Sequence, residues 1–362
     1  MKEKISHIII GGDRKVKKIL SGGVDFFTTI AWTILWFPMA LKNAMNTSYY
    51  PEQSRKNLVK RVTENILWVL KYHRANGFYT LYGLDIKGKS SKGYIDENSF
   101  WKKLDEINYS NGLTSQICLL RDKFMFYKYM KENQLPVPEV FGIVKDGKLY
   151  SNDLQEQDFE MLKDKTDYFM KDVDGECASF VKHITGYSDL KKVCEERKKG
   201  FYILQESVHQ SKKMNELNSK SINTLRIVTV HSKGKIKVLS SLLRVGTSET
   251  GNVDNWAAGG LAIGIQNNGY LKKYGLYKPG HGLKISEHPD SKIEFEKYKV
   301  PMLNEAYDLA IKAHKFFYNV GAIGWDVAIT DDGPIFIEGN DNFEITLMQA
   351  CDRPLKKEWL AL

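Results

Sequence analysis

The stretch GWDVAITDDGPIFIEGNDN, residues 324–342, constrains the fold of this chain more than any other. Two runs with the alternating pattern of half-buried strands flank the segment Asp331, Asp332, Gly333 and Pro334, whose residue types favour turns. The pattern therefore predicts an antiparallel hairpin with one face on a core and the other face accessible.

Each strand of this hairpin carries an acid. If Ile329 and Ile335 are the last pair before a five-residue loop, Asp326 lies opposite Glu338. Because side chains alternate between the faces of a strand, these two acids and Asn340 share one face. The other face, expected to enter the core, carries Trp325, Val327, Ile329, Ile335 and Ile337.

The facing acids need a physical reason. Directly opposed side chains have Cβ atoms about 4.5–5.5 Å apart, and like charges at that distance destabilise a sheet. Two carboxylates and an amide oxygen are ligands that Mg²⁺ accepts together with phosphate oxygens. The hairpin thus predicts a magnesium site at Asp326, Glu338 and Asn340, with a solvated hairpin carrying incidental acids as the alternative.

The rest of the chain mixes helical and strand patterns. Apolar residues at helical spacing predict helices over residues 57–72, 122–133 and 306–317. Short strands are predicted at Phe141–Val144, Tyr168–Lys171, Phe201–Gln205, Leu225–His231 and Lys237–Arg244. This mixture predicts an α+β fold rather than alternating βαβ units, preceded by a mainly helical N-terminal domain over residues 1–112.

Composition narrows the class of protein. The four cysteines are scattered along the 362 residues, which argues against a disulfide scaffold or a zinc site and suits a reducing cytoplasm. The net charge of +9 indicates either scattered surface lysines or attraction to an anionic ligand or membrane. Neither an arginine-rich arm nor a nucleic-acid motif is present, so nucleic acid is not an expected partner.

One apolar segment complicates a purely soluble interpretation. Residues Phe26–Leu41 carry no charge, but as a helix they would reach only about 24 Å, less than a bilayer span of about 20 apolar residues requires. No convincing cleavage site follows them, which argues against a signal peptide. The segment is either a buried helix or an interfacial anchor, for which Trp32, Trp36 and the flanking basic residues would be suited.

Two lysines are candidates for binding phosphate. Lys123 opens the helix predicted after Asp122, and Lys171 ends a predicted strand before the loop DVDGECAS. A lysine is a compact point charge suited to phosphate oxygens. Residues 205–208, QESV, end another strand and could present backbone groups to an adenine edge.

Taken in order, these pieces resemble the ATP-grasp superfamily over about residues 115–362. The resemblance rests on DK followed by LPVPEV, then YFMKDVDG, LQES, NTLRIVTV and the acidic strand pair ending FIEGN. More narrowly, the chain resembles the sugar-transfer-associated ATP-grasp family. The motifs that carry this narrower resemblance are FYTLYGLD, SINTLRIVT, LLRVG, VDNWAAGG, HP at 288–289, and GWDVAIT with GPIFIEGN.

The resemblance implies that ATP lies between two α+β subdomains, residues 113–205 and 206–362. Lys123 and Lys171 would hold its phosphates, and Mg²⁺ would be bound by the acidic hairpin. Residues Gln205, Glu206 and Val208 would meet the adenine.

The resemblance also assigns residues to the reaction. Arg226 and Arg244 match arginines near the acyl phosphate of carboxylate–amine ligases, and Asn255 belongs to an Asn-x-x-x-Gly-Gly element close to the reacting groups. His281, in a glycine-rich loop, is a candidate for substrate contact or proton transfer.

The chain departs from the family pattern at two points. The loop after Lys171 has one glycine, Gly175, which leaves Ser179 as a substitute phosphate donor. No Pro-Gly element follows Asn340, so the acceptor pocket is expected to differ.

The expected activity is that of an ATP-dependent carboxylate–amine ligase acting through an acyl phosphate. It would amidate a sugar acid with an amino acid or amine during capsule or exopolysaccharide biosynthesis, in the cytoplasm or at the inner face of the membrane. Two alternatives stay open: an ATP-grasp kinase acting on a sugar hydroxyl, and a nucleotide-binding scaffold held at the membrane by residues 26–41.

Overall fold

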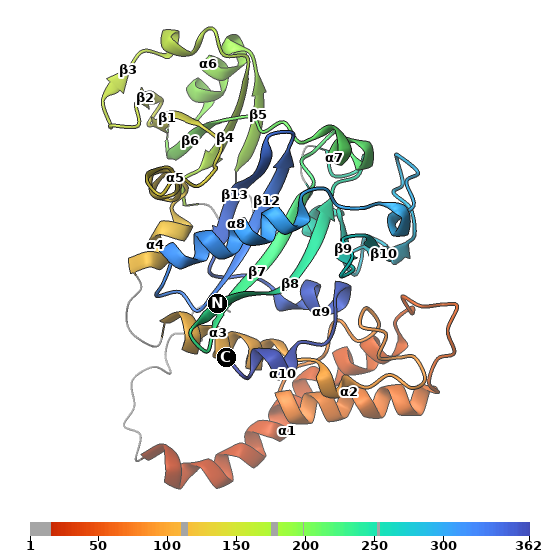
Figure 1. Cartoon of the computed structure of the whole chain (residues 1–362). Coiled ribbons are helices and arrows are strands. Elements are labelled where there is room, and N and C mark those ends of the chain that lie inside the picture. The colour runs from red at the N-terminus through yellow and green to blue at the C-terminus, as the bar shows by residue number, and fades with distance from the viewer. Residues whose placement is uncertain (1–15, 110–114, 175–179, 198, 252–253) are drawn as a thin grey trace. The chain divides into compact units, whose positions relative to one another are not determined.

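The chain forms two compact units, Met1–Lys92 and Gly93–Leu362 (Figure 1). The structure, a computed structural model, describes residues 16–109, 115–174, 180–197, 199–251 and 254–362. The second unit begins ahead of the boundary predicted after residue 112, because helix α3 (Glu97–Tyr109) packs with strands of this unit.

The first unit is built on two helices, α1 (Val16–Met45) and α2 (Leu58–Tyr72), which pack against each other. The helix predicted over residues 57–72 is confirmed, and its start is fixed by Asn57, whose side chain accepts a hydrogen bond from the Lys60 amide at 2.8 Å. Among the described helices, none combines the length and the hydropathy needed to cross a membrane.

A buried lysine organises the rest of the first unit. The Nζ of Lys56 donates to the Glu64 carboxylate at 2.8 Å and to the carbonyl oxygens of Leu84 at 2.6 Å and Lys89 at 2.9 Å. Asp85, the last residue of FYTLYGLD, is fully buried and pairs with Arg55 at 2.8 Å. This motif therefore supplies partners to a cluster of charged side chains, which buried charges require.

The smaller sheet of the second unit has six antiparallel strands in the order β3-β2-β1-β6-β4-β5. Its strands are β1 (Val140–Lys145), β2 (Lys148–Tyr150), β3 (Glu156–Gln157), β4 (Asp167–Asp172), β5 (Val181–Thr185) and β6 (Phe201–Glu206). Helix α6 (Tyr187–Glu196) lies against it, and α4 (Ser115–Arg121) and α5 (Lys123–Glu132) precede it in the chain. Alternation along β4 puts Tyr168 and Met170 into the core and leaves Lys171 on the other face.

The larger sheet has seven antiparallel strands in the order β11-β10-β9-β8-β7-β12-β13. Its strands are β7 (Thr224–Ser232), β8 (Lys235–Val245), β9 (Leu261–Ile265), β10 (Leu271–Leu276), β11 (Lys284–Ile285), β12 (Ala322–Thr330) and β13 (Gly333–Asn340). All five predicted strands and the helix predicted over 306–317, α8 (Leu303–Phe316), are confirmed.

Helices cover both faces of this sheet. Ala306, Ala310 and Ala313 of α8 share a core with Ile227 and Trp325 on one face. On the other side, α9 (Ile345–Cys351) and α3 contact the strands, and α10 (Lys356–Trp359) adds Trp359 to an aromatic cluster with Phe100 and Phe343. The short helix α7 (Lys212–Leu217) precedes β7.

The β12–β13 hairpin pairs Asp326 with Glu338, as predicted, but the predicted loop is wrong. Thr330 pairs with Gly333, so the turn contains only Asp331 and Asp332 rather than five residues. A register shift between Asp326 and Val327 restores the acidic pair. It is a β-bulge, in which one strand carries an extra residue.

The bulge also changes which residues of β13 enter the core. Val327 pairs with Phe336, which is fully buried with its ring centroid 4.9 Å from that of Trp325. Ile335 and Ile337, which were predicted to face the core, are only half-buried. The prediction failed because it assumed unbroken alternation along the strand.

Candidate functional site

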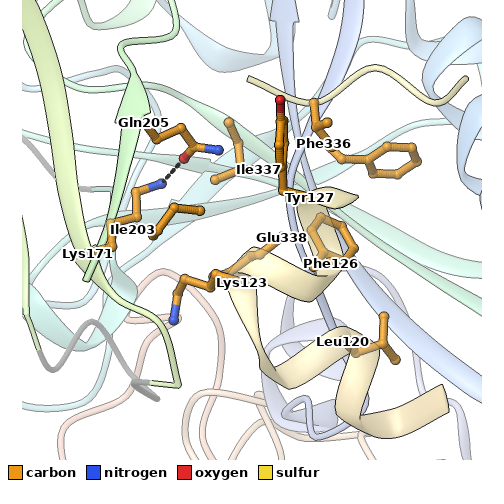
Figure 2. Close-up of a pocket in the computed structure, with 11 residues that line it drawn as sticks. Leu120, Lys123, Phe126, Tyr127, Lys171, Ile203, Gln205, Phe336, Ile337 and Glu338 are labelled. Atoms are coloured by element: carbon orange, nitrogen blue, oxygen red, sulfur yellow. Dashed lines mark hydrogen bonds between the residues drawn. The ribbon is translucent and has the colours of Figure 1, made fainter. Parts of the chain in front are cut away.

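A pocket in the second unit is bounded by α4 and α5, by two strands of the smaller sheet, and by the acidic hairpin (Figure 2). Its walls are mostly apolar, with three charged side chains among them. The lining residues are Leu120, Lys123, Phe126, Tyr127, Val137, Lys171, Ile203, Gln205, Phe336, Ile337 and Glu338. Apolar walls with a few convergent polar groups are typical of small-molecule sites.

Both lysines predicted to bind phosphate line this pocket. Lys171 extends from β4 and donates from Nζ to Oε1 of Gln205 at 3.0 Å, and burial lowers its pKa to about 8. Lys123 is the first residue of α5, whose amides Phe124 and Met125 are capped by the preceding Asp122 at 2.9 and 2.8 Å. Burial lowers the pKa of Lys123 as well.

Glu338 is the acid that faces these lysines. Burial raises its pKa, and the negative charge of Asp326 raises it further. The negative charge of Glu338 in turn raises the pKa of both Lys123 and Lys171, against the effect of their burial. Glu338 therefore interacts electrostatically with the lysines on one side and with Asp326 on the other.

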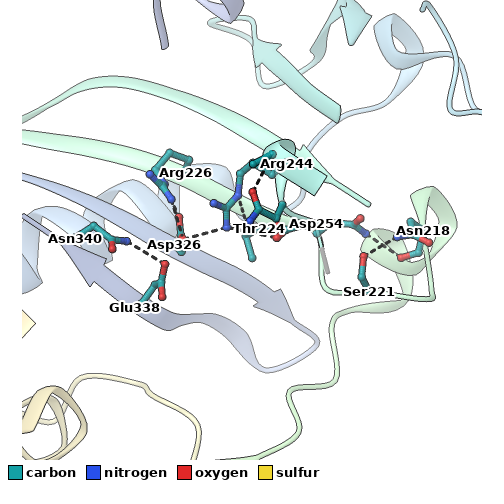
Figure 3. A network of polar contacts seen from close by, with 12 residues as sticks. Asn218, Ser221, Thr224, Arg226, Arg244, Asp254, Asp326, Glu338 and Asn340 are labelled. Carbon is teal, nitrogen blue, oxygen red and sulfur yellow. Dashed lines mark hydrogen bonds and ion pairs between the residues drawn. The ribbon is translucent and has the colours of Figure 1, made fainter. Parts of the chain in front are cut away.

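Asp326 is held by two arginines from neighbouring strands (Figure 3). Arg226 on β7 donates through Nε and Nη2 to both carboxylate oxygens, the second bond measuring 3.0 Å, and Nη2 of Arg244 on β8 lies 3.0 Å from Oδ2. Burial alone would raise the pKa of Asp326, but the two guanidinium groups outweigh it and hold that pKa well below its ordinary value. The two arginines thus offset the repulsion between Asp326 and Glu338. From the sequence, a metal ion was predicted to do this.

Two residues that the sequence analysis missed hold Arg244 in place. The Thr224 hydroxyl accepts from Nε of Arg244 at 3.0 Å, and Asp254 lies 3.5 Å from Nη2. Asp254 also accepts hydrogen bonds from the backbone amide of Thr224 at 3.1 Å and from its hydroxyl. Burial alone would lower the pKa of Arg244, but Asp254, Asp326 and Glu338 raise it above its ordinary value. Asp254 belongs to the VDNWAAGG motif. The motif therefore indicated this loop, but the prediction named the neighbouring Asn255 rather than Asp254.

The side chain of Asn255 stabilises the local backbone of this fold. It accepts from the Ala257 amide at 2.9 Å and caps the short 3₁₀ turn Trp256–Ala258. Gly259 follows in the left-handed region with φ 101°, and a Cβ on Gly260 would lie 2.7 Å from the Asp254 carbonyl oxygen. The exposed His281 lies beside this turn: a Cβ added to Gly259 would be 3.3 Å from the Nδ1 atom of His281. The catalytic roles expected of Asn255 and His281 stay predictions.

The residues expected to meet adenine lie at the end of β6. Gln205 lines the pocket and donates to the Pro138 carbonyl at 3.4 Å, and the Glu206 amide donates to the Glu139 carbonyl at 2.8 Å. Val208 is half-buried just beyond the strand. Ser179, the expected substitute phosphate donor, lies outside the described residues.

The hairpin fits a magnesium ion through its donor chemistry. In the described part of the chain, no group of three or more histidines, cysteines and acids is arranged to hold a metal. Mg²⁺ instead commonly takes one or two carboxylates plus phosphate oxygens. Glu338 and Asn340 suit this arrangement, since they are two residues apart on β13 and Asn340 donates to Glu338 at 3.1 Å, whereas Asp326 is engaged by arginines.

Two antiparallel sheets, a lysine-bearing pocket and an acidic hairpin beside it define an ATP-grasp fold. Residues 187–358 match the model of the family described as sugar-transfer associated ATP-grasp. This part of the chain is therefore similar to that family, and the predicted fold and the predicted resemblance are both confirmed.

Solved structures give distant similarities. The biotin carboxylase domain of 2-oxoglutarate carboxylase from Hydrogenobacter thermophilus, in complex with MgADP, ADP and bicarbonate, has a TM-score of 0.41 at 14% identity, covering 75% of this chain and 48% of that one. N5-carboxyaminoimidazole ribonucleotide synthetase from Thermotoga maritima has a TM-score of 0.37 at 18% identity, covering 66% and 48%. A RimK domain ATP-grasp protein from Sphaerobacter thermophilus has a TM-score of 0.37 at 12% identity, covering 65% of each chain. The chain thus spans about half the length of the first two. A search of curated proteins found no match.

Proposed function

We propose that this protein is an ADP-forming ATP-grasp ligase that joins a carboxylate to an amine. One observation carries the proposal. Lys123 and Lys171 face Glu338 in one pocket, and the strand neighbour of Glu338, Asp326, is the point on which Arg226 and Arg244 converge. Cations suited to phosphate and cations suited to a carboxylate therefore flank the same pair of acids.

The lysines would hold the phosphates of ATP, and the end of β6 would receive its adenine. Phosphoryl transfer needs little covalent help from a protein, because positioning and neutralisation of charge supply most of the acceleration. Bound Mg²⁺, held by Glu338 and Asn340 with Asp326 beside them, would neutralise charge on the phosphate oxygens.

The arginines would position the acid substrate. An oxygen of the substrate carboxylate attacks the γ-phosphorus, the bond to ADP breaks, and an acyl phosphate forms. The amine then attacks the carbonyl carbon and loses a proton, and phosphate leaves with the former carboxylate oxygen. Guanidinium groups bind carboxylate and phosphate oxygens in bidentate fashion and stabilise the negative charge that develops at the carbonyl oxygen.

For the substrates, we propose a sugar acid such as a uronic acid and an amino acid or other amine. The family description, sugar-transfer associated ATP-grasp, supports a role in assembling capsule or exopolysaccharide. Such a reaction would draw on cytoplasmic ATP, in keeping with the scattered cysteines.

An isotope experiment tests the reaction type. Uronic acids labelled with oxygen-18 in the carboxylate are incubated with ATP, Mg²⁺ and a panel of amines, and the released phosphate is analysed by mass spectrometry. We expect one oxygen-18 atom per phosphate, and ADP formation only when acid and amine are both present. Unlabelled phosphate, or a stable phosphorylated sugar as the product, would contradict the ligase and favour the kinase.

A further inference from the structure

The first unit exposes an unusual amount of apolar side chain on α1. Over residues 31–45, the part of this helix whose side chains the structure describes, Ile34 and Leu35 are 70% and 64% exposed, and only a narrow stripe, including Ala40 and Ala44, is buried. The other large apolar residues exposed in this part of the helix are Trp32, Phe37, Met39, Leu41 and Met45. The segment considered as a buried helix in the sequence analysis therefore keeps most of its described apolar side chains accessible.

Helix α2 carries a second apolar face. Its buried residues Trp68 and Val69 lie on one side, whereas Val59 is 75% and Leu67 is 57% exposed on the other, next to Leu70. At 100° per residue, these three exposed residues share one face of the helix. A solvated helix face is normally polar, so α2 resembles α1 in presenting apolar groups away from its packing partner.

Lysines border these apolar faces. Helical spacing places Lys60 and Lys71 at one edge of the exposed face of α2, and both are exposed. Lys42 is exposed near the end of α1. An apolar face edged by lysines is the arrangement of helices that lie in the interface of a membrane.

The charge of the chain is divided unequally between the two units. Residues 1–92 contain 16 lysines and arginines against six acids, a net charge of +10, whereas residues 93–362 carry −1 of the total of +9. The basic excess is therefore not scattered over the surface of the whole protein. It belongs to the unit that exposes the apolar helices.

We propose that the unit formed by residues 1–92 docks on an anionic lipid surface through the exposed faces of α1 and α2. The apolar side chains would enter the boundary between headgroups and acyl chains, and the lysines would lie at the level of the anionic headgroups. A second copy of the chain is a poorer occupant, since it would bring two units of charge +10 together. This docking is independent of the ligase chemistry, because the residues that line the pocket belong to the other unit.

Vesicle co-sedimentation of the full chain tests the proposal. One set of vesicles contains equal parts of phosphatidylcholine and phosphatidylglycerol, and the other contains phosphatidylcholine alone. We expect binding to the first set, weakened by salt, because surface attraction is screened over about 8 Å at physiological ionic strength. Lys60→Gln/Lys71→Gln should weaken partition about 30-fold, since each lysine near an anionic surface contributes roughly fivefold. The matched control Lys192→Gln/Lys235→Gln removes two exposed lysines of the other unit and should bind like the wild type.

A second pair of variants tests the apolar contribution. Leu67→Gln/Leu70→Gln alters exposed side chains only and should abolish sedimentation with the anionic vesicles, whereas Met161→Gln/Tyr318→Gln, at exposed apolar positions elsewhere, should not. Circular dichroism confirms that each variant is folded. Absence of binding by the folded wild type would overturn the proposal, as would equal binding by both apolar pairs. Sedimentation velocity that detects a dimer lost specifically in Leu67→Gln/Leu70→Gln would assign the face to a second copy instead.

Discussion

At the scale of single residues, the site depends on charges removed from water and matched to partners. Lys171 is half-buried with Gln205 as its hydrogen-bond partner, and its pKa falls to about 8. Asp326 is more fully buried and faces two arginines, and its pKa moves well below the ordinary range. Partners thus determine which buried group keeps its charge.

The first prediction concerns phosphate binding by Lys171. Lys171→Met should weaken ATP binding by about tenfold or more, because a hydrogen bond to a charged group contributes about 1.5–3 kcal/mol, and should leave adenosine binding unchanged. Isothermal calorimetry measures both affinities. Lys182→Met, the exposed lysine paired with Met170 on the adjacent strand, is the matched control. Equal losses for ATP and adenosine would make Lys171 a structural residue.

The second prediction concerns the pH dependence of that affinity. Lys171 in the ATP-free protein is protonated below its pKa of about 8, and ATP favours the protonated form. ATP affinity should therefore be level below pH 8 and fall above it, by up to about tenfold per pH unit. Lys171→Met should lose this part of the pH profile. An unchanged profile in the variant would assign the titration to another group.

The third prediction concerns Asp254, which positions Arg244. Asp254→Asn should lower kcat by about tenfold or more and leave the KM for ATP nearly unchanged, because Asp254 contacts the arginine rather than the lysine pocket. Combining it with Arg244→Lys should add little, since the two residues act together. Asp290→Asn, which loses a hydrogen bond from the Ser248 amide but touches no arginine in the described part of the chain, serves as the control. Strict additivity in the double variant would separate the roles of Asp254 and Arg244.

At the scale of elements, the hairpin shows how a bulge can preserve the pairing of two acids. A two-residue turn shifts the register by one relative to the predicted loop, and the extra residue on β13 shifts it back at Asp326. Phe336 then fills the core beside Trp325, while Ile337 and Glu338 line the pocket. β-bulges commonly occur beside active sites, where they redirect a side chain.

The fourth prediction concerns the contact between β9 and α9. A Cβ on Gly264 would lie 2.0 Å from the carbonyl oxygen of Cys351, so the strand and helix could not keep their spacing. Gly264→Ala should destabilise the chain by about 1–3 kcal/mol, as is typical of overpacking. Gly77→Ala, where nothing lies within 4 Å of the added atom, is the control. Urea unfolding measures both, and equal midpoints would contradict close packing at Gly264.

At the scale of the whole molecule, the pocket and the excess of positive charge belong to different units. The residues that line the pocket lie within 93–362, whose net charge is −1, and residues 1–92 carry +10. Such a division concentrates the attraction to an anionic surface in one unit.

The fifth prediction follows from this division. A fragment containing residues 93–362 should bind ATP with nearly the affinity of the full chain, and it should pass through a cation-exchange column at pH 7 that retains the full chain. Calorimetry and chromatography measure the two properties. Loss of ATP binding by a folded fragment would mean that the first unit contributes to the site.

The sequence by itself determined the features that depend on neighbours along the chain. Asn57 and Asp122 cap helices where the pattern predicted them, and the apolar spacing predicted α8. These features follow from hydrogen bonds and side-chain periodicity within a few residues.

Only the tertiary structure decided how separate elements meet. The convergence of Arg226 and Arg244 on Asp326 requires the strand order β8-β7-β12, and the hold of Asp254 on Arg244 requires a loop to fold back beside β8. The bulge could not be predicted from the sequence either. It forms because the core accommodates Phe336 rather than Ile337. The exposure of α1 and α2 likewise depends on which faces find partners. Sequence periodicity marks an apolar face, but only packing determines whether that face is covered.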